Sequence, residues 1–292
     1  MISSFLQYIQ YEKRCSPHTL ISYETDLQQF HTFLTTSYEL PSPETASFPM
    51  IRSWIVSLVE EKKNASSVNR KIATLRTYYK FLLKKNVITS DPMMKVKSLK
   101  LSKPLPQFVD ENSLNQLLDT FDFPDTFAGH RDRLLMELLY GTGIRLSEMI
   151  ELQEKDINTH EGVIKVTGKR NKQRIIPVSK RLLSLLTTYC IEKKQLFPDG
   201  NSHVIVTDSG DKIYPMMVYR IVKKHLDLAT TIEKRSPHVL RHTFATHLLN
   251  KGADLNAIKD LLGHSSLAAT QVYTHNSLEK LKNIFEQAHP KA

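Results

Sequence analysis

The sequence predicts a mainly α-helical protein of two domains, with a small β-sheet or hairpin in the second. Apolar residues recur at steps of three and four along most of the 292 residues, which is typical of amphipathic helices. The stretch 98–107 contains two prolines and two lysines without periodicity, as linkers do. We therefore expect a helical domain at 1–97, a linker at 98–107 and a mixed, mostly α-helical domain at 108–292.

Three helices are expected in the first domain. Ser16 and Pro17 suit the start of the first helix, because serine caps helix N-termini and proline is accepted in the first turn. Its apolar stripe extends to Leu34. Further stripes occupy 51–59 and 68–82, the latter ending near Asn86. The aromatic residues in these stripes are interpreted as core.

The second domain should contain several helices around one hairpin. Residues 163–178 form two β-branched runs that flank a polar turn from Gly168 to Lys172, which predicts the hairpin. Gly141 and Gly143 are expected to end the helix that begins near Arg131, because glycine favours helix C-termini. The expected helices cover 111–118, 131–140, a short segment from 146, 179–194, 216–228, 239–251, 254–262 and 276–288.

The charge distribution favours an anionic partner. The chain has 40 Lys and Arg against 30 Asp and Glu, and residues 51–100 hold a net charge of +9, against −3 for 1–50 and +4 for 101–292. Concentrated positive charge is typical of nucleic-acid binders. The third helix presents a basic row that could follow a phosphate backbone: Arg70, Arg76, Lys80 and Lys84. A solvated lysine-rich helix face is the alternative.

Several protein classes are excluded by composition. Two cysteines, Cys15 and Cys190, are too few for a disulfide-stapled scaffold and favour a reducing compartment. No apolar run approaches the roughly 18 residues of a membrane span, and the N-terminus lacks a basic-then-apolar signal pattern. We expect a cytoplasmic protein without a membrane partner.

The segment 237–247 contains residues that could do chemistry. His238 and Arg241 are three residues apart and therefore neighbours on one helix face. His238 and His242 have the spacing of paired zinc ligands, but the zinc-protease pattern requires Glu where Val239 stands. We predict no metal and no cofactor. A buried histidine beside a surface arginine is the structural alternative.

Four further residues are ordinary when taken singly. Arg145 follows a glycine-rich turn at a helix start, Lys169 lies in the hairpin turn, His264 follows Gly263, and Tyr273 lies nine residues later. Arginine forks match phosphate oxygens, histidine transfers protons near neutrality, and lysine can protonate a leaving oxygen. Beside such cations a tyrosine hydroxyl becomes a usable nucleophile. The set can therefore transfer a phosphodiester from DNA to protein.

The order of these motifs resembles the tyrosine recombinase (phage integrase) family. The resemblance rests on the segments GTGIRLSE, GKRNK, HVLRH, LGH and the final tyrosine, together with SPHTLISYETDLQQF and SVNRKIATLRTYYKFL upstream. The compact length is most similar to the bacterial Xer recombinases. The resemblance implies a SAM-like core-binding domain at 1–97 and a catalytic domain at 108–292, placed on opposite faces of duplex DNA.

The resemblance also implies roles for the site residues. Arg145 and Arg241 would hold the scissile phosphate, Lys169 would protonate the 5′-oxygen, and His238 would serve as acid and base. His264 would donate a hydrogen bond to the phosphate, and Tyr273 would attack to give a 3′-phosphotyrosyl bond. Arg170 and Lys172 flank the lysine position, and Tyr219, an alternative tyrosine, is expected in the core.

Partners follow from the same resemblance. Strand exchange through a Holliday junction requires a tetramer, formed with itself or with a second Xer-type recombinase, and the FtsK translocase is a candidate activator. The helix 276–288 would dock into a neighbouring protomer, or alternatively pack on its own domain. Chromosome-dimer resolution is the favoured activity. The alternatives are integration of a mobile element, a type IB topoisomerase and a non-catalytic DNA-binding accessory protein.

Overall fold

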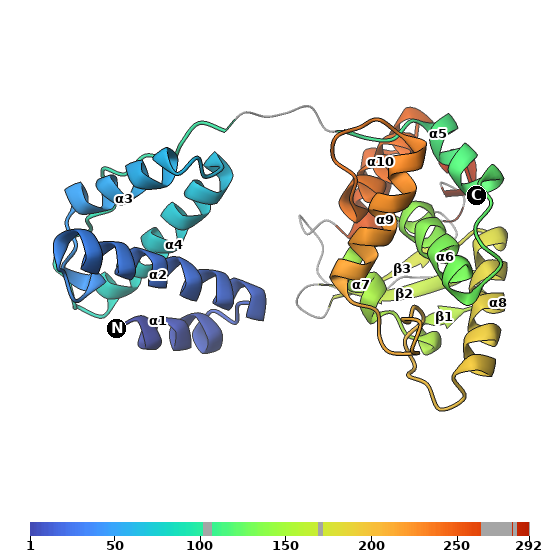
Figure 1. Cartoon of the computed structure of the whole chain (residues 1–292), viewed down its shortest axis with the longest axis horizontal. Helices are drawn as coiled ribbons and strands as arrows, with labels where there is room; N and C mark the ends of the chain where they lie inside the picture. The colour runs from blue at the N-terminus through green and yellow to red at the C-terminus, as the bar shows by residue number, and fades with distance from the viewer. Residues whose placement is uncertain (102–106, 169–171, 264–281, 283–284, 292) are drawn as a thin grey trace. The chain divides into compact units, whose positions relative to one another are not determined.

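The computed structural model describes residues 1–101, 107–168, 172–263, 282 and 285–291. The chain divides into two compact units, Met1–Pro104 and Leu105–Ala292 (Figure 1). Each unit has its own apolar core. The expected fold class, two mainly helical domains with a small sheet in the second, is confirmed.

The first unit is helical throughout its regular structure. It contains α1 (Ile2–Gln7), a π-helical turn η1 (Tyr8–Glu12), α2 (Pro17–Tyr38), a 3₁₀ turn η2 (Pro43–Thr45), α3 (Phe48–Glu60) and α4 (Ala65–Lys84). As expected, Ser16 caps α2 by accepting a hydrogen bond from the Thr19 amide. α1 was not expected from the sequence, and it begins without a side-chain cap. Its Phe5 is nevertheless fully buried.

Aromatic residues dominate the core of the first unit, as their spacing predicts. The side chains of Phe30 and Trp54 pack with ring centroids 4.8 Å apart, and Tyr78 and Tyr79 on α4 are buried. Each buried tyrosine finds a polar partner: Tyr78 donates to Glu44 and Tyr79 to the Pro43 carbonyl. Burying a hydroxyl without such a partner would be costly. The hydrogen bonds of these two tyrosines therefore fix the buried face of α4 to the segment that contains Pro43 and Glu44.

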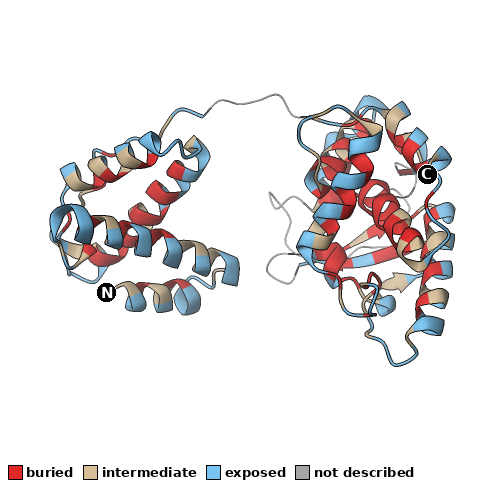
Figure 2. Cartoon of the chain, viewed as in Figure 1, coloured by how far each residue is buried: buried red, intermediate tan, exposed pale blue. Residues whose placement is uncertain are grey.

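The second unit surrounds a central helix. Its elements are α5 (Glu111–Asn115), η3 (Gln116–Thr120), α6 (Phe127–Thr142), α7 (Leu146–Glu151), η4 (Glu154–Asp156), β1 (Ile157–Asn158), β2 (Val163–Thr167), β3 (Gln173–Pro177), α8 (Lys180–Leu196), α9 (Pro215–Ala229), α10 (Pro237–Asn250) and α11 (Leu255–Leu262). α6 is buried over most of its length (Figure 2). It packs against α8 and α10 (Figure 1).

The expected hairpin is present and gains a third strand. β2 and β3 pair antiparallel from Val163 opposite Pro177 to Thr167 opposite Gln173. The short strand β1 pairs with β2 and was not expected from sequence, because two residues give no detectable alternation. The Gly168 amide donates to the Lys172 carbonyl at 2.7 Å and closes the base of the hairpin loop.

Two expectations about glycine and tyrosine were wrong. Gly141 lies inside α6, where a Cβ atom would stand 3.1 Å from Leu182 of α8; close helix packing accounts for it. Gly143 alone ends α6, with φ of +59°. Tyr219 was expected in the core but is 41% exposed on α9.

The C-terminal residues 285–291 pack on their own unit. Phe285 and Ala288 are buried, and the His289 ring stacks on Phe285 with centroids 4.9 Å apart. The Lys291 ammonium group pairs with Asp119 at 2.6 Å. Residues 285–291 therefore pack on their own domain, which was the alternative to docking into a neighbouring protomer. Most of the expected helix 276–288 lies outside the described residues.

Candidate functional site

The turn between α6 and α7 positions Arg145. Gly143 takes a left-handed conformation, which reverses the chain after α6, and α7 then begins directly after Arg145. The Glu148 carboxylate accepts hydrogen bonds from the Arg145 amide at 2.9 Å and from its guanidinium at 2.8 Å. The other terminal nitrogen of Arg145 donates to the Gly263 carbonyl at 2.9 Å. Arg145 is therefore fixed by α7 and by the end of α11.

α10 positions His238 and Arg241 near its N-terminus. Proline occupies the first turn of this helix, and the two side chains are three residues apart, as expected. His238 is exposed, whereas Arg241 is buried. The Arg241 guanidinium donates to the carbonyls of Gly143 and Leu262. The two predicted arginines thus meet where the ends of α6 and α11 come together.

Two residues that were not expected from the sequence, Arg174 and Glu148, complete this cluster. Arg174 on β3 is buried and donates to both carboxylate oxygens of Glu148, at 2.8 and 2.9 Å. Glu148 was visible as a carboxylate three residues after Arg145 at a helix start, the position of a capping box. Arg174 lies on the same face of β3 as the buried Ile176. A charged residue at a position where the strand alternation predicts an apolar one was the sequence signal for Arg174.

The electrostatics of the cluster are strongly positive. Arg145, Arg174 and Arg241 surround the single carboxylate of Glu148, a formal charge of +2. Burial, followed by the charges of Arg145 and Arg174, lowers the pKa of Arg241 to about 9, against the opposing charge of Glu148. Burial acts to raise the pKa of Glu148, but its contacts with Arg174 and then Arg145 hold that pKa below its usual value.

Arg241 has no carboxylate partner within the described ranges of the chain; its hydrogen bonds go to backbone carbonyls. A buried guanidinium of this kind is costly without a counter-charge. Guanidinium groups bind phosphate oxygens through paired hydrogen bonds. The cluster is therefore suited to an anion with at least two oxygens, such as a phosphodiester.

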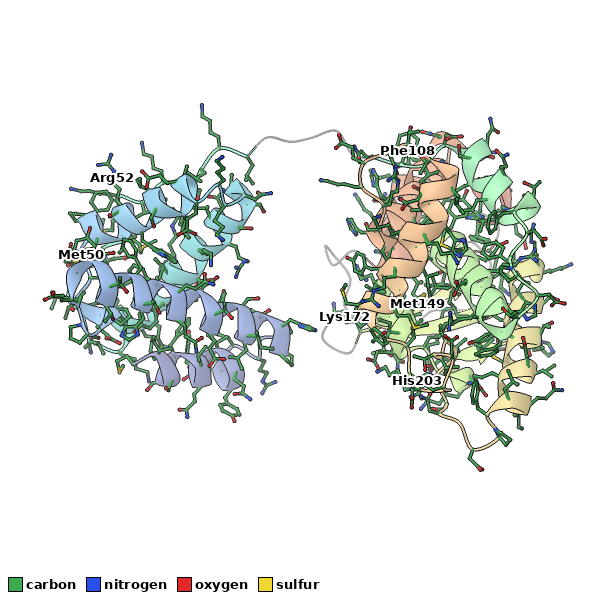
Figure 3. All side chains as sticks on the ribbon, in the orientation of Figure 1. Met50, Arg52, Phe108, Met149, Lys172 and His203 are labelled. Carbon is green, nitrogen blue, oxygen red and sulfur yellow. The ribbon has the colours of Figure 1, made fainter. Side chains whose placement is uncertain are left out.

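The remaining predicted residues of this site, Lys169, His264 and Tyr273, lie outside the described residues. The residues that precede Lys169 and His264, which are Gly168 and Gly263, lie next to the arginine cluster. A Cβ atom on Gly168 would stand 3.1 Å from the Glu148 carboxylate and 4.0 Å from the Arg145 guanidinium. Figure 3 labels Met149, next to Glu148 on α7, and Lys172, at the far end of the hairpin loop. Gly263, which precedes His264, accepts the hydrogen bond from Arg145.

The basic residues of α4 are partly engaged within the first unit. Arg70 pairs with the buried carboxylate of Asp26 at 2.5 Å. Arg76 donates to the Val96 carbonyl and to Ser98. Lys84 lies 3.7 Å from Glu12 and over the Tyr8 ring. Lys80 is exposed. A role of this row in DNA binding stays a prediction.

The described residues lack the features of a metal site and of a membrane span. No group of three or more His, Cys, Asp or Glu side chains among them could hold a metal ion. Burial, and then the neighbouring His238, lowers the pKa of His242. No helix in the described part of the chain is long and apolar enough to cross a bilayer.

Both units match known family models. Residues 107–280 match the phage integrase family, and residues 2–86 match the phage integrase N-terminal SAM-like domain. These two matches cover the regions that hold the arginine cluster and the basic helix α4.

Curated relatives match the chain from end to end. The tyrosine recombinase XerC of Oceanobacillus iheyensis is 38% identical, over 100% of this chain and 96% of the relative. XerC of Chlorobaculum parvum is 36% identical, over 100% and 94%, and XerD of Staphylococcus haemolyticus is 34% identical, over 100% and 99%.

Solved structures share the fold. A XerH recombinase bound to palindromic difH, in a post-cleavage complex, has a TM-score of 0.73 at 23% identity, over 97% of this chain and 83% of that one. The Tn1549 transposon integrase in complex with transposon right-end DNA has a TM-score of 0.71 at 17% identity, over 97% and 98%.

Proposed function

Since the chain belongs to the phage integrase family of tyrosine recombinases, we propose that its arginine cluster binds the scissile phosphate of a specific DNA site. The catalytic set would comprise six residues: Arg145, Lys169, His238, Arg241, His264 and Tyr273. The observation that carries this proposal is the buried Arg241, whose described partners are carbonyls and whose charge a bound phosphate would compensate. The positions of Gly168 and Gly263 against the cluster support including the residues that follow them.

The cleavage step is a transfer of phosphorus between two oxygens. The hydroxyl oxygen of Tyr273 would bond to phosphorus while the bond from phosphorus to the 5′-oxygen breaks. The tyrosine proton would pass to His238, and Lys169 would give a proton to the departing 5′-oxygen. Arg145 and Arg241 would hold the non-bridging oxygens as negative charge increases on them. The products are a 3′-phosphotyrosine and a free 5′-hydroxyl.

Rejoining reverses this chemistry on a different strand. The phosphotyrosine keeps the energy of the broken diester, so the 5′-hydroxyl of a partner duplex can attack without ATP. One exchange of strands gives a Holliday junction, and a second exchange resolves it. This cycle would need four protomers, from this chain alone or together with a second Xer-type recombinase.

Chromosome-dimer resolution is the cellular role we propose. The support is similarity to proteins named XerC and XerD, at 34–38% identity over 100% of this chain and 96–99% of those relatives. The DNA substrate would place the protein in the cytoplasm, and FtsK is a candidate activator. Integration of a mobile element is the alternative role.

A strand-exchange assay tests the proposal. A binding site is first selected from random duplexes with the full-length chain, and two duplexes of different length carrying it are then incubated with the protein. We expect Holliday junctions and recombinants of new lengths. Relaxation of supercoiled plasmid without junctions would indicate a type IB topoisomerase, and binding without any strand breakage would indicate an accessory protein.

The cellular role has its own test. Deleting the gene should leave chromosome dimers unresolved, seen as filaments with unsegregated nucleoids. Normal segregation together with loss of a mobile element's integration would favour the alternative role.

A further inference from the structure

Arg174 connects three elements of the candidate site. Its side chain leaves β3 and is only 6% exposed. Two terminal nitrogens donate to the Glu148 carboxylate on α7, and Nε donates to the Leu261 carbonyl of α11 at 2.9 Å. One guanidinium therefore joins the hairpin to the helix that begins at Arg145 and to the helix that ends before His264.

The side chain of Arg174 also packs closely against the end of α11. Gly263 has φ of +63°, and a Cβ atom there would stand 2.9 Å from Cδ of Arg174. The stem of Arg174 thus fills the space below Gly263, whose carbonyl accepts from Arg145. A shorter or displaced side chain at 174 would leave both the Gly263 carbonyl and the Glu148 carboxylate less constrained.

Charge is the second consequence of this arrangement. The same Glu148 oxygen, Oε1, accepts from Arg145 and from Arg174, each at 2.8 Å. Without Arg174, Arg145 would be the one guanidinium among the described residues that donates a hydrogen bond to this carboxylate. Arg145 would then be neutralised by Glu148, and the formal charge of the cluster would fall from +2 to +1.

We propose that Arg174 is a positioning residue that occupies Glu148 and thereby keeps the charge of Arg145 available to a phosphodiester. The inference rests on the proposed function, in which Arg145 binds the scissile phosphate. The charge of Arg174 is already matched by the Glu148 carboxylate, whereas Arg241 donates to carbonyls, so Arg174 is not the group assigned to DNA. It acts through Glu148 and through the end of α11.

The test compares R174M with a double variant, R174M/E148Q. Single-turnover cleavage is measured on a nicked duplex carrying the selected site, together with DNA affinity. We expect R174M to cleave roughly 10–100-fold more slowly, as for other groups that orient a catalytic residue, with DNA affinity changed much less. E148Q removes the negative charge that would neutralise Arg145 in R174M. The double variant should therefore recover about tenfold of the lost rate.

R131M is the matched control. Arg131 is also a buried arginine that pairs with carboxylates, those of Asp132 and Asp208, but it lies outside the arginine cluster. R131M should lower thermal stability about as much as R174M while cleaving at the wild-type rate. Wild-type cleavage by R174M, or a double variant no faster than R174M, would overturn the inference. If R174M does not fold, R174Q takes its place, because its neutral amide cannot balance the charge of Glu148.

A second readout separates this inference from the proposed function. Inorganic phosphate is titrated at constant ionic strength, and the shift in melting temperature is recorded. We expect a larger shift for the wild type than for R174M, with recovery in R174M/E148Q. Equal shifts would overturn the inference even if DNA is cleaved. A wild type that binds phosphate in this pattern but never cleaves DNA would contradict only the proposed function.

Discussion

Arg241 shows how a single residue can indicate function. Arg241 is 6% exposed, and its guanidinium donates to two backbone carbonyls, those of Gly143 and Leu262. A buried charge is normally matched by an opposite charge, but the hydrogen bonds of Arg241 go to carbonyls, and the charge of Glu148 acts against those of Arg145 and Arg174. A bound anion would offset the cost of burying this charge.

Gly143 has a backbone conformation that favours glycine, in the turn between α6 and α7. It adopts φ of +59°, and a Cβ atom there would stand 2.5 Å from the Phe244 ring. We expect G143A to lower the free energy of unfolding by about 1–2 kcal/mol from backbone conformation alone, with the ring clash in addition. Urea denaturation measures this loss.

Gly252 provides a matched control for that substitution. Its φ is +84°, but a Cβ atom there would meet nothing within 4 Å. G252A should therefore show the backbone cost alone and leave DNA cleavage unchanged. A G143A variant no less stable than G252A would refute the packing argument.

At the level of secondary structure, local signals were sufficient for most helices. Ser16 and Asp254 cap α2 and α11 as their sequence positions predict. Contacts between distant segments were not accessible in this way. Arg174 and Glu148 are 26 residues apart on a strand and a helix, and no periodicity relates them. The expectation that Tyr219 is buried was wrong for a similar reason. The helical period of 3.6 residues shows that a helix has faces, but it does not show which face packs against the rest of the domain.

The basic row of α4 can be tested through Lys80. This lysine is exposed, whereas its neighbours Arg70 and Arg76 are held by contacts within the unit. If Lys80 meets a phosphate, K80E should weaken DNA binding and reduce the slope of log affinity against log salt by about one. Fluorescence anisotropy at several salt concentrations measures both. K63E, on an exposed lysine outside α4, should change neither; equal effects would mean a general charge effect.

The C-terminal segment should respond to pH through His289. Burial lowers the pKa of His289 to about 3, and its Nδ1 accepts a hydrogen bond from the Lys291 amide. The released segment therefore takes up a proton below about pH 6.5, while the packed segment remains neutral, so acid favours release. Between about pH 7.5 and 5.5 the opening equilibrium should rise about tenfold.

Hydrogen exchange at the His289 amide, which donates to the Phe285 carbonyl, reports this opening. H289F keeps an aromatic ring against Phe285 and Tyr140 but cannot be protonated, so its opening should not depend on pH in this range. His247, Glu137 and Asp119 also titrate nearby, and a pH dependence that survives in H289F would assign the effect to them.

The whole molecule combines two compact units that carry different charged groups. The net charge of +9 in residues 51–100 lies in the first unit, while the arginine cluster lies in the second. Composition, charge and motif order were enough to predict this division and the recombinase family. The cis packing of residues 285–291 was an open alternative, because one sequence does not distinguish a contact within a chain from the same contact between chains.

The central claim is that this chain cleaves DNA by forming a covalent bond through Tyr273. The most direct measurement traps that bond on a nicked duplex of the selected site, with EDTA present, and maps the modified peptide by mass spectrometry. We expect a denaturation-resistant adduct on the peptide that contains Tyr273, absent from Y273F, which should still bind the duplex. An adduct on another residue, or one that persists in Y273F, would contradict the claim.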